Sequence, residues 1–246
     1  MKLILLRHGQ SQWNLENRFT GWKDVSLTQN GIDEAIFSGK QISKMNIKIN
    51  SVYTSLLNRA TETTDIVTNI IKFPKDDIQY DWRLNERHYG ALQGLNKSET
   101  ASKYGEDQVH IWRRSYDIPP PLLKDNDQRH PRFNNKFKII DADLPNGESL
   151  KNVIDRLKPF WKKYVNYIIQ KKGAHLIVAH SNSLRAIVKI LDQLSHEKII
   201  SVNIPTGVPL VYTLDESLNV LEKEYLISEE KLKEKQEIVA NQGKAK

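Results

Sequence analysis

Two histidines that follow predicted strands are the residues of this chain best suited to chemistry. His8 follows the apolar segment 2–6, and His180 ends a second apolar segment at 174–180. Because open α/β sheets bind ligands at the carboxyl ends of their strands, we expect both imidazoles at that edge. A single histidine after a strand is more often structural. Two at equivalent strand ends, each beside arginine, asparagine or serine, favour a shared site.

Such a pair is suited to phosphoryl transfer. A neutral imidazole can attack phosphorus through one ring nitrogen while the other donates to a backbone carbonyl and fixes the tautomer. The transferred group is strongly negative, so its oxygens need cations that are already in place. A guanidinium suits this best, because its planar fork pairs with two oxygens at once. The candidates are Arg7 and Arg59, although an isolated arginine is more often a solvated surface residue.

The reaction also needs a carboxyl group that exchanges a proton with the leaving or attacking hydroxyl. Glu86 follows a third predicted strand, at 78–84, and can therefore reach the same edge. Lys97 and the pair Arg113–Arg114 add positive charge, unless they belong to an ordinary solvated helix face. The predicted catalytic residues are Arg7, His8, Arg59, Glu86 and His180.

Short apolar segments alternate with amphipathic ones along the chain. Strands are predicted at 2–6, 51–55, 78–84, 174–180, 208–214 and 219–227. Helices are predicted at 57–72, 149–172, 183–194 and 229–240, and another begins after Thr28, which is its predicted N-cap. Pro159 is expected to kink the helix at 149–172 or to start a new turn there. The segment 99–115 is predicted to be helical in pieces. This order predicts an α/β fold, a three-layer sandwich with a mainly parallel central sheet flanked by helices.

We expect one catalytic domain over residues 1–227. The proline-rich segment 116–147 is predicted to be a loop insertion, and loops of this length are usually functional or mobile. The charged segment 228–246 is predicted to be a tail that closes over the active site as a lid. The alternative for the tail is plain fraying of a terminus.

Charge and composition narrow the classes of partner. The net charge of +7 suits acidic ligands, although a modest lysine excess is also common in soluble proteins. No run of five like charges occurs, and no apolar run approaches the roughly 20 residues of a membrane span. The chain has no cysteine, and its histidines show no metal-binding spacing. We therefore expect a cytoplasmic protein that binds a small phosphorylated molecule, without nucleic acid, membrane or metal.

Seven blocks of sequence occur in a characteristic order. They are RHGQSQWN at 7–14, ENRFTGW at 16–22, WRLNERHYG at 82–90, LQGLNK at 92–97, WRRSYD at 112–117, NSLR at 182–185 and IPTGVPL at 204–210. Over about residues 2–227 they resemble the histidine phosphatase superfamily, and within it the cofactor-dependent phosphoglycerate mutases. An RHG triplet alone would be weak evidence, whereas these blocks in this order are specific.

The resemblance implies a role for each predicted residue. His8 would be the phosphorylated nucleophile and Glu86 the proton donor and acceptor, while Arg7, Arg59 and His180 would hold the phosphoryl group. The substrate-binding residues would be Gln10, Ser11, Asn14, Thr20, Gly21, Arg87, His88, Tyr89, Lys97, Arg113, Arg114, Ser181 and Asn182.

The implied reaction is the glycolytic and gluconeogenic interconversion of 3-phosphoglycerate and 2-phosphoglycerate through a phosphohistidine at His8. 2,3-Bisphosphoglycerate would be both primer and intermediate, and no metal would take part. The resemblance also implies a homodimer or a higher homo-oligomer.

Ser181 departs from the family pattern, which has glycine after the second histidine. Glycine would permit a positive φ or a close backbone approach. Serine adds a Cβ and a hydroxyl, which would either introduce strain or supply one more hydrogen-bond donor. We expect an active enzyme with altered turnover.

Two alternatives stay open from the sequence. The first is a phosphatase, or an enzyme that forms 2,3-bisphosphoglycerate, within the same superfamily; the Thr20–Gly21 pair and the Arg113–Arg114 block favour a mutase instead. The second is an inactive protein that binds phosphoanions or nucleic acid, and the intact set of predicted catalytic residues argues against it.

Overall fold

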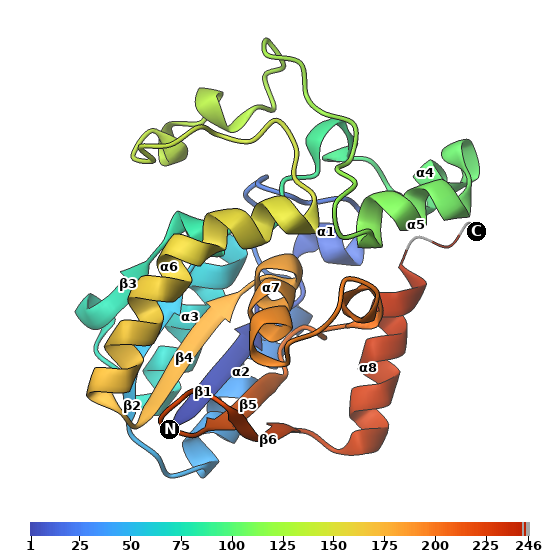
Figure 1. The fold of residues 1–246 in the computed structure, drawn as a ribbon. Helices are drawn as coiled ribbons and strands as arrows, with labels where there is room; N and C mark the ends of the chain where they lie inside the picture. The colour runs from blue at the N-terminus through green and yellow to red at the C-terminus, as the bar shows by residue number, and fades with distance from the viewer. Residues whose placement is uncertain (243, 245–246) are drawn as a thin grey trace.

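A computed structural model describes residues 1–242 and 244, and a six-stranded sheet runs through its centre (Figure 1). The strands are β1 (Lys2–Arg7), β2 (Ile49–Thr54), β3 (Ile78–Tyr80), β4 (Ala174–Ala179), β5 (Pro209–Leu214) and β6 (Val220–Tyr225). Their order is β3-β2-β4-β1-β5-β6, in which β1 to β4 pair in parallel while β5 and β6 are antiparallel. The predicted α/β fold with a mainly parallel sheet is confirmed.

Helices cover both faces of the sheet. They are α1 (Gln12–Leu15), α2 (Gln29–Lys44), α3 (Asn58–Ile71), α4 (Lys97–Tyr104), α5 (Glu106–Arg114), α6 (Leu150–Lys171), α7 (Ser181–Leu191) and α8 (Glu229–Asn241). In Figure 1, α6 and α7 lie in front of the sheet and α2 and α3 lie behind it. Thr28 caps α2 as predicted, because its hydroxyl accepts from the N–H of Gly31.

The central strand β1 supplies side chains to both helical layers, as the period of two along a strand requires. Leu3 and Leu5 are fully buried in the cluster that contains the apolar faces of α6 and α7. Ile4 and Leu6 are fully buried in the cluster on the other face, with residues of α2 and α3. The two clusters anchor β1, so the residues directly after its end are held on a rigid base.

The third predicted strand is shorter than expected. The interval 78–84 was predicted to be extended throughout, but β3 ends at Tyr80 and Trp82–Leu84 form a 3-10 turn. The cause is Asp81, whose carboxylate accepts from the backbone N–H of Arg83 at 2.9 Å and pairs with its guanidinium at the same distance. Such a local side-chain bond competes with the strand ladder and starts a turn.

Two helix predictions also need correction. The helix predicted at 183–194 begins at Ser181, because His180 is its N-cap and donates its N–H to the hydroxyl of Ser183 at 3.1 Å. Pro159 neither ends α6 nor starts a new helix, since it lies inside one continuous helix of 22 residues. The other predicted elements agree with the structure within a few residues at their ends.

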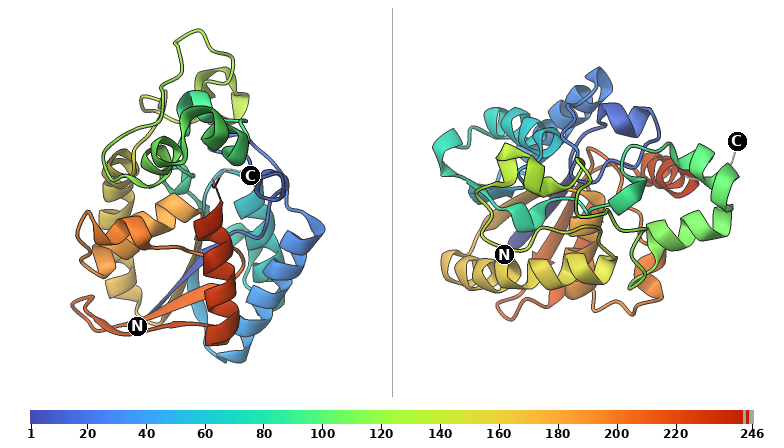
Figure 2. Two further views of the ribbon diagram at one scale, coloured as in Figure 1. Left: turned by 90° about the vertical axis from the view of Figure 1, so that its right-hand side faces the viewer. Right: turned by 90° about the horizontal axis from the view of Figure 1, so that it is seen from above.

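The long connection 116–147 lies beyond the carboxyl edge of the sheet, and α8 runs along the sheet toward α4 and α5 (Figure 2). The connection is irregular apart from the 3-10 turns Pro131–Phe133 and Asn135–Phe137. Phe137 packs against Trp22 at 5.1 Å between ring centroids, which fixes one side of the loop. Over the described residues, no helix has the length and apolarity needed to cross a bilayer.

Candidate active site

A cavity lies beyond the carboxyl ends of β1 and β4. Its lining residues are Arg7, His8, Asn14, Arg18, Thr20, Arg59, Glu86, Tyr89, Lys97, Arg113, Arg114, Ser181, Asn182, Arg185, Val239 and Gln242. Seven of them are arginine or lysine, and Glu86 is the one carboxylate in this described lining. Such an imbalance of buried charge needs an anionic ligand.

His8 stands at the base of this cavity as a neutral imidazole whose Nε2 lone pair faces Arg59. Its Nδ1 lies 2.7 Å from the carbonyl of Gly9 and can only donate to it, so Nδ1 carries the proton. Its Nε2 accepts from the Nε of Arg59 at 3.3 Å. Burial, followed by the charges of Arg59 and Arg7, holds the pKa of His8 well below its usual range. The side chain is therefore ready to act as a nucleophile at neutral pH.

Gly9 is required by the packing behind His8. A Cβ on this residue would lie 2.1 Å from the carbonyl oxygen of Gly31, in the first turn of α2. Only glycine allows the two backbones to approach so closely. This contact explains the glycine of the RHG triplet and fixes the loop that orients the His8 ring.

His180 lies beside His8, with 4.9 Å between the ring centroids. Its Nε2 is 2.7 Å from the hydroxyl of Ser55, which also accepts from the N–H of Leu57. The hydroxyl hydrogen is thus free to point at Nε2, which leaves the proton on Nδ1. In the described chain this buried Nδ1 has no partner. A phosphoryl oxygen on His8 would supply one. Burial, then Arg59 and His8, lowers the pKa of His180.

Arg7 and Arg59 are both almost completely buried around the two imidazoles. Arg7 donates from Nη1 to the carbonyl of Ile204 at 2.7 Å, while its Nε has no partner in the described chain. Arg59 donates to the carbonyls of Gly21 at 2.9 Å and Lys23 at 3.1 Å. Burial lowers the pKa of Arg59 to about 10, which leaves it charged at neutral pH. Both cations are held in place before any anion arrives.

The carboxylate of Glu86 is held by one oxygen. Its Oε1 accepts from the N–H of Arg87 at 2.7 Å, and from the N–H and Nδ2 of Asn182 at 3.1 and 2.9 Å. Its Oε2 makes no hydrogen bond within the described residues, and Glu86 lines the cavity. Three donors occupy Oε1, so a proton on this carboxyl group must reside on Oε2. The free oxygen is therefore the one that can exchange protons with a ligand.

A second group of cations lies on the wall formed by α4 and α5. Lys97 and Arg113 are buried. Burial is the main cause that holds the pKa of Lys97 well below its usual range. It also lowers the pKa of Arg113 to about 10. Lys97 donates to the Oε1 of Gln242 at 3.3 Å. Arg114 donates to the Oδ1 of Asn203 at 2.6 Å. No carboxylate pairs with these three cations in the described chain.

Five of the predicted substrate-binding residues do not belong to the described lining of the cavity. They are Gln10, Ser11, Gly21, Arg87 and His88. Ser11 caps α1, and the N–H of Gln10 donates to Glu34 at 2.8 Å. Gly21 contributes a carbonyl to Arg59. These three residues hold the walls of the site, and direct contact with substrate stays a prediction for them.

Arg87 and His88 also act behind the cavity wall. Arg87 lies 4.6 Å from the ring of Tyr89 and donates to the carbonyls of Trp112 and Arg113 at 3.0 and 2.9 Å. His88 accepts on Nδ1 from the N–H of Gly90 at 3.0 Å. Arg87 thereby fixes the end of α5, where the paired arginines lie, and the structure places its guanidinium outside the lining.

Four lining residues were not among the predicted site residues: Arg18, Arg185, Val239 and Gln242. Arg185 had a usable signal, because it lies one helical turn after Asn182 and donates to its Oδ1 at 3.0 Å. Arg18 lies within a block that we had linked to the family. Val239 and Gln242 belong to the tail that was predicted to close over the site, although neither residue was singled out as a site residue.

A family model described as the histidine phosphatase superfamily (branch 1) matches residues 3–223. The chain belongs to this superfamily. It is 49% identical over 244 residues to a protein of Hydrogenobaculum sp. (strain Y04AAS1), with 99% of each chain covered. It is 48% identical over 246 residues to a protein of Borreliella burgdorferi (strain ZS7), covering 100% of this chain and 99% of the relative. Both relatives are named 2,3-bisphosphoglycerate-dependent phosphoglycerate mutase.

Several solved structures share the fold at lower identity. A structure described as mycobacterial hydrolase 1 superposes with a TM-score of 0.70 at 19% identity, covering 92% of this chain and 96% of the other. A mycobacterial glucosyl-3-phosphoglycerate phosphatase has a TM-score of 0.67 at 20% identity, covering 86% and 92%. At these identities the likeness concerns the fold alone.

Ser181, which stands where the family pattern has glycine, does not need a positive φ. The residue is the first of α7 and has helical geometry, so glycine is not needed for an unusual φ. Its side chain lines the cavity beside His180. The structure therefore excludes strain from a positive φ and places an additional hydroxyl at the cavity. Within the described residues, no three His, Cys, Asp or Glu side chains form a group that could hold a metal.

Proposed function

We propose that this chain is a 2,3-bisphosphoglycerate-dependent phosphoglycerate mutase, which interconverts 3-phosphoglycerate and 2-phosphoglycerate. The observation that carries the proposal is that a nucleophilic ring nitrogen and an unbonded carboxyl oxygen lie at one cationic cavity. His8 presents the lone pair of Nε2, and Glu86 presents Oε2. Relatives with this name, nearly half identical over the full chain, support the same activity.

The first transfer uses His8 as nucleophile and Glu86 as acid. The Nε2 lone pair forms a bond to phosphorus, the ester P–O bond breaks, and the leaving oxygen takes the proton from Glu86 Oε2. Arg7, Arg59 and the Nδ1–H of His180 surround the transferred oxygens and stabilise their charge. In the return transfer the substrate hydroxyl gives its proton to Glu86 while its oxygen attacks phosphorus, and the N–P bond breaks.

The outer cations fit a ligand that carries more than one anionic group. His8 takes its first phosphoryl group from 2,3-bisphosphoglycerate, which bears two phosphates and a carboxylate. The side chains of Lys97, Arg113 and Arg114 have no carboxylate partner among the described residues, and they line the cavity from α4 and α5. We assign the second phosphate and the carboxylate to these residues, together with Thr20 and Tyr89, and we place Asn14 at the transferred phosphoryl group. Arg113 and Arg114 offer the planar forks that bind such groups in a bidentate manner.

Residues 1–227 form the catalytic domain in this proposal, and the tail closes over the site with its described residues 228–242. Residues 243, 245 and 246 of the predicted lid lie outside the described residues. Support comes from α8, where Lys235 pairs with Glu34 at 2.7 Å and the backbone of Val239 accepts from Arg114. A closed site protects phosphohistidine from water, which a mutase must do while the substrate turns over. We further propose a cytoplasmic homodimer or higher homo-oligomer that binds small phosphorylated molecules and not nucleic acid or membranes.

The proposal is tested by incubating the protein with 2,3-bisphosphoglycerate labelled in its phosphates. We expect one acid-labile phosphate, mapped to His8, together with interconversion of the two monophosphoglycerates. His8→Asn should abolish both, whereas His110→Asn, at an exposed position in α5, should leave both unchanged. Phosphatase and bisphosphoglycerate synthase activities measured side by side should be minor. A label on another residue, or hydrolysis faster than isomerisation, contradicts the proposal.

A further inference from the structure

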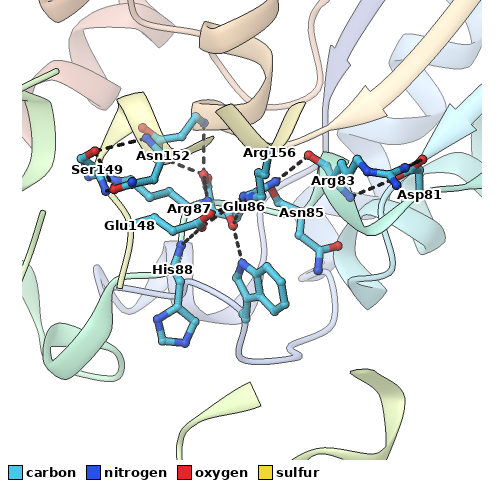
Figure 3. Close-up of polar contacts among 12 residues, drawn as sticks. Asp81, Arg83, Asn85, Glu86, Arg87, His88, Glu148, Ser149, Asn152 and Arg156 are labelled. Carbon is cyan, nitrogen blue, oxygen red and sulfur yellow. Dashed lines mark hydrogen bonds and ion pairs between the residues drawn. The ribbon is translucent and has the colours of Figure 1, made fainter. Parts of the chain in front are cut away.

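The backbone that carries Glu86 is held from outside the cavity by one guanidinium. Arg156, in α6, donates to the carbonyls of Arg83 at 2.5 Å, Asn85 at 2.9 Å and Glu86 at 3.0 Å (Figure 3). Its side chain is 9% exposed, and it does not belong to the described lining of the cavity. Arg156 therefore acts on the loop and not on a ligand.

Glu148 completes this arrangement from the segment before α6. It pairs with Arg156 through Oε1 at 2.6 Å and Oε2 at 3.2 Å. Its Oε2 also accepts from the N–H of His88 at 2.8 Å, and its own N–H donates to the carbonyl of His88 at the same distance. The carboxylate is 4% exposed. The pair thus fixes the loop at residues on both sides of Glu86.

The loop has no regular structure that could hold it otherwise. Residues 85–89 follow a 3-10 turn and form neither helix nor strand, so their carbonyls lack ladder partners. The carbonyl of Glu86 accepts from Arg156 and from the indole of Trp22 at 2.6 Å. Its Oε1 is held on the cavity side by Arg87 and Asn182. Backbone and side chain are clamped from opposite sides, which leaves Oε2 in one position.

We propose that Arg156 and Glu148 are positioning residues, whose role in the reaction is to aim Oε2 of Glu86 at the substrate oxygen. The inference rests on the proposed function, because it assigns a task to the proton-exchanging group of that reaction. A displacement of about 1 Å of a catalytic group can cost about a hundredfold in rate. The guanidinium fork is essential here, since no other side chain reaches three carbonyls and a carboxylate together.

The decisive variant is Arg156→Lys, which keeps the charge beside Glu148 but loses the fork. We expect kcat for 3-phosphoglycerate to fall at least tenfold while KM changes less than threefold. Vanadate, which probes the phosphoryl cage around His8, should bind with an affinity within threefold of the wild type. A fall of less than threefold in kcat, or a parallel loss of vanadate affinity, overturns the inference.

Glu148→Gln is the second variant, because the amide keeps an acceptor for the N–H of His88 and removes the ion pair. In this variant kcat should also fall while the affinity for vanadate is kept, but the fall in kcat should be smaller than in Arg156→Lys. Leu157→Val is the matched control, since Leu157 is the next residue of α6, is fully buried in the apolar core and makes no hydrogen bond to the loop through its side chain. It should lower the melting temperature without the loss of kcat.

A double-mutant cycle separates positioning from general damage. If Arg156 acts through Glu86, then adding Arg156→Lys to Glu86→Gln should change the single-turnover rate of His8 phosphorylation less than twofold. Full additivity of the two losses would show that Arg156 acts by another route and would overturn the inference. A wild type without mutase activity, or a fully active Glu86→Gln variant, would instead remove the proposed function itself.

Discussion

The Nε of Arg59 donates to the Nε2 of His8 across 3.3 Å, so one guanidinium touches the nucleophilic atom directly. The two Nη atoms of Arg59 are bonded to the carbonyls of Lys23 and Gly21, which fixes the orientation of the plane. The Nε–H that faces the lone pair before reaction is therefore in place to face a phosphoryl oxygen after it. Arg59 both lowers the pKa of His8 and prepares the cage for its product.

This double role predicts different behaviour for two variants of Arg59. Arg59→Lys keeps the charge but loses the fork, and phosphorylation of His8 should slow about a hundredfold, as when one preorganised donor is removed from an oxyanion site. Arg59→Met should lose at least as much in rate and should also raise the pKa of His8, because a nearby positive charge no longer disfavours the imidazolium.

The two effects are separated by following the His8 ring by NMR in the absence of ligand. The pKa of His8 should rise in Arg59→Met and should change much less in Arg59→Lys. An unchanged pKa in Arg59→Met would show that burial alone suppresses protonation. In that case the contact would serve the phosphoryl group only.

His88 predicts a specific dependence of stability on pH. Burial, then the neighbouring charges of His130 and Arg156, lowers the pKa of His88 to about 3. Between pH 6.5 and that value the unfolded chain binds a proton at this residue and the folded chain does not. The free energy of unfolding therefore falls as pH falls, by about 1.4 kcal/mol per pH unit for one histidine.

Urea unfolding of the wild type and of His88→Gln at pH 7 and pH 5 checks this expectation. From pH 7 to pH 5, the free energy of unfolding of the variant should fall by about 1 to 2 kcal/mol less than that of the wild type. This difference is the effect of the one proton that His88 binds only in the unfolded chain below pH 6.5. Between pH 7 and pH 8 the two proteins should change alike. Equal losses on acidification would mean that His88 is protonated in the folded state.

Ser181→Gly tests the additional hydroxyl in the cavity. Because residue 181 is helical, the wild type should be an active enzyme and the variant should fold normally, with at most about 1 kcal/mol lost from glycine in a helix. Loss of a hydrogen-bond donor to the bound anion should raise KM about two- to tenfold. Steady-state kinetics with both monophosphoglycerates provide the measurement. An inactive wild type that glycine rescues would contradict the expectation.

Removal of the tail tests the closure of the site. A chain that ends after Ser228 lacks α8 and the cavity-lining residues Val239 and Gln242. We expect the mutase kcat to fall at least tenfold and the phosphohistidine at His8 to hydrolyse faster, because water reaches the N–P bond. The lifetime of the acid-labile phosphate after a rapid mixing step measures this directly. An unchanged lifetime would show that α8 does not exclude water.

The order of the elements was predictable because local patterns decide it. The apolar run 176–179, which does not alternate, indicated a strand buried on both faces, and β4 is such a strand. Thr28 marked the start of a helix by its capping chemistry, together with the helical spacing of Ile32, Ala35 and Ile36. The end of β3 was missed because a single side-chain bond from Asp81 competed successfully with the ladder. Local rules of this kind fix where elements lie and leave their ends uncertain.

The sequence alone determined which residue types can carry a phosphoryl group and that they follow predicted strands. Their shared location was predictable because the carboxyl ends of parallel strands lie at one edge of the sheet. The tertiary structure decided which atoms are free. It showed that Glu86 keeps Oε2 unbonded, that Arg156 holds the loop from 70 residues away, and that Gln242 meets Lys97 across 145 residues. Contacts between such distant residues depend on how whole layers pack, and no local pattern in the chain encodes them.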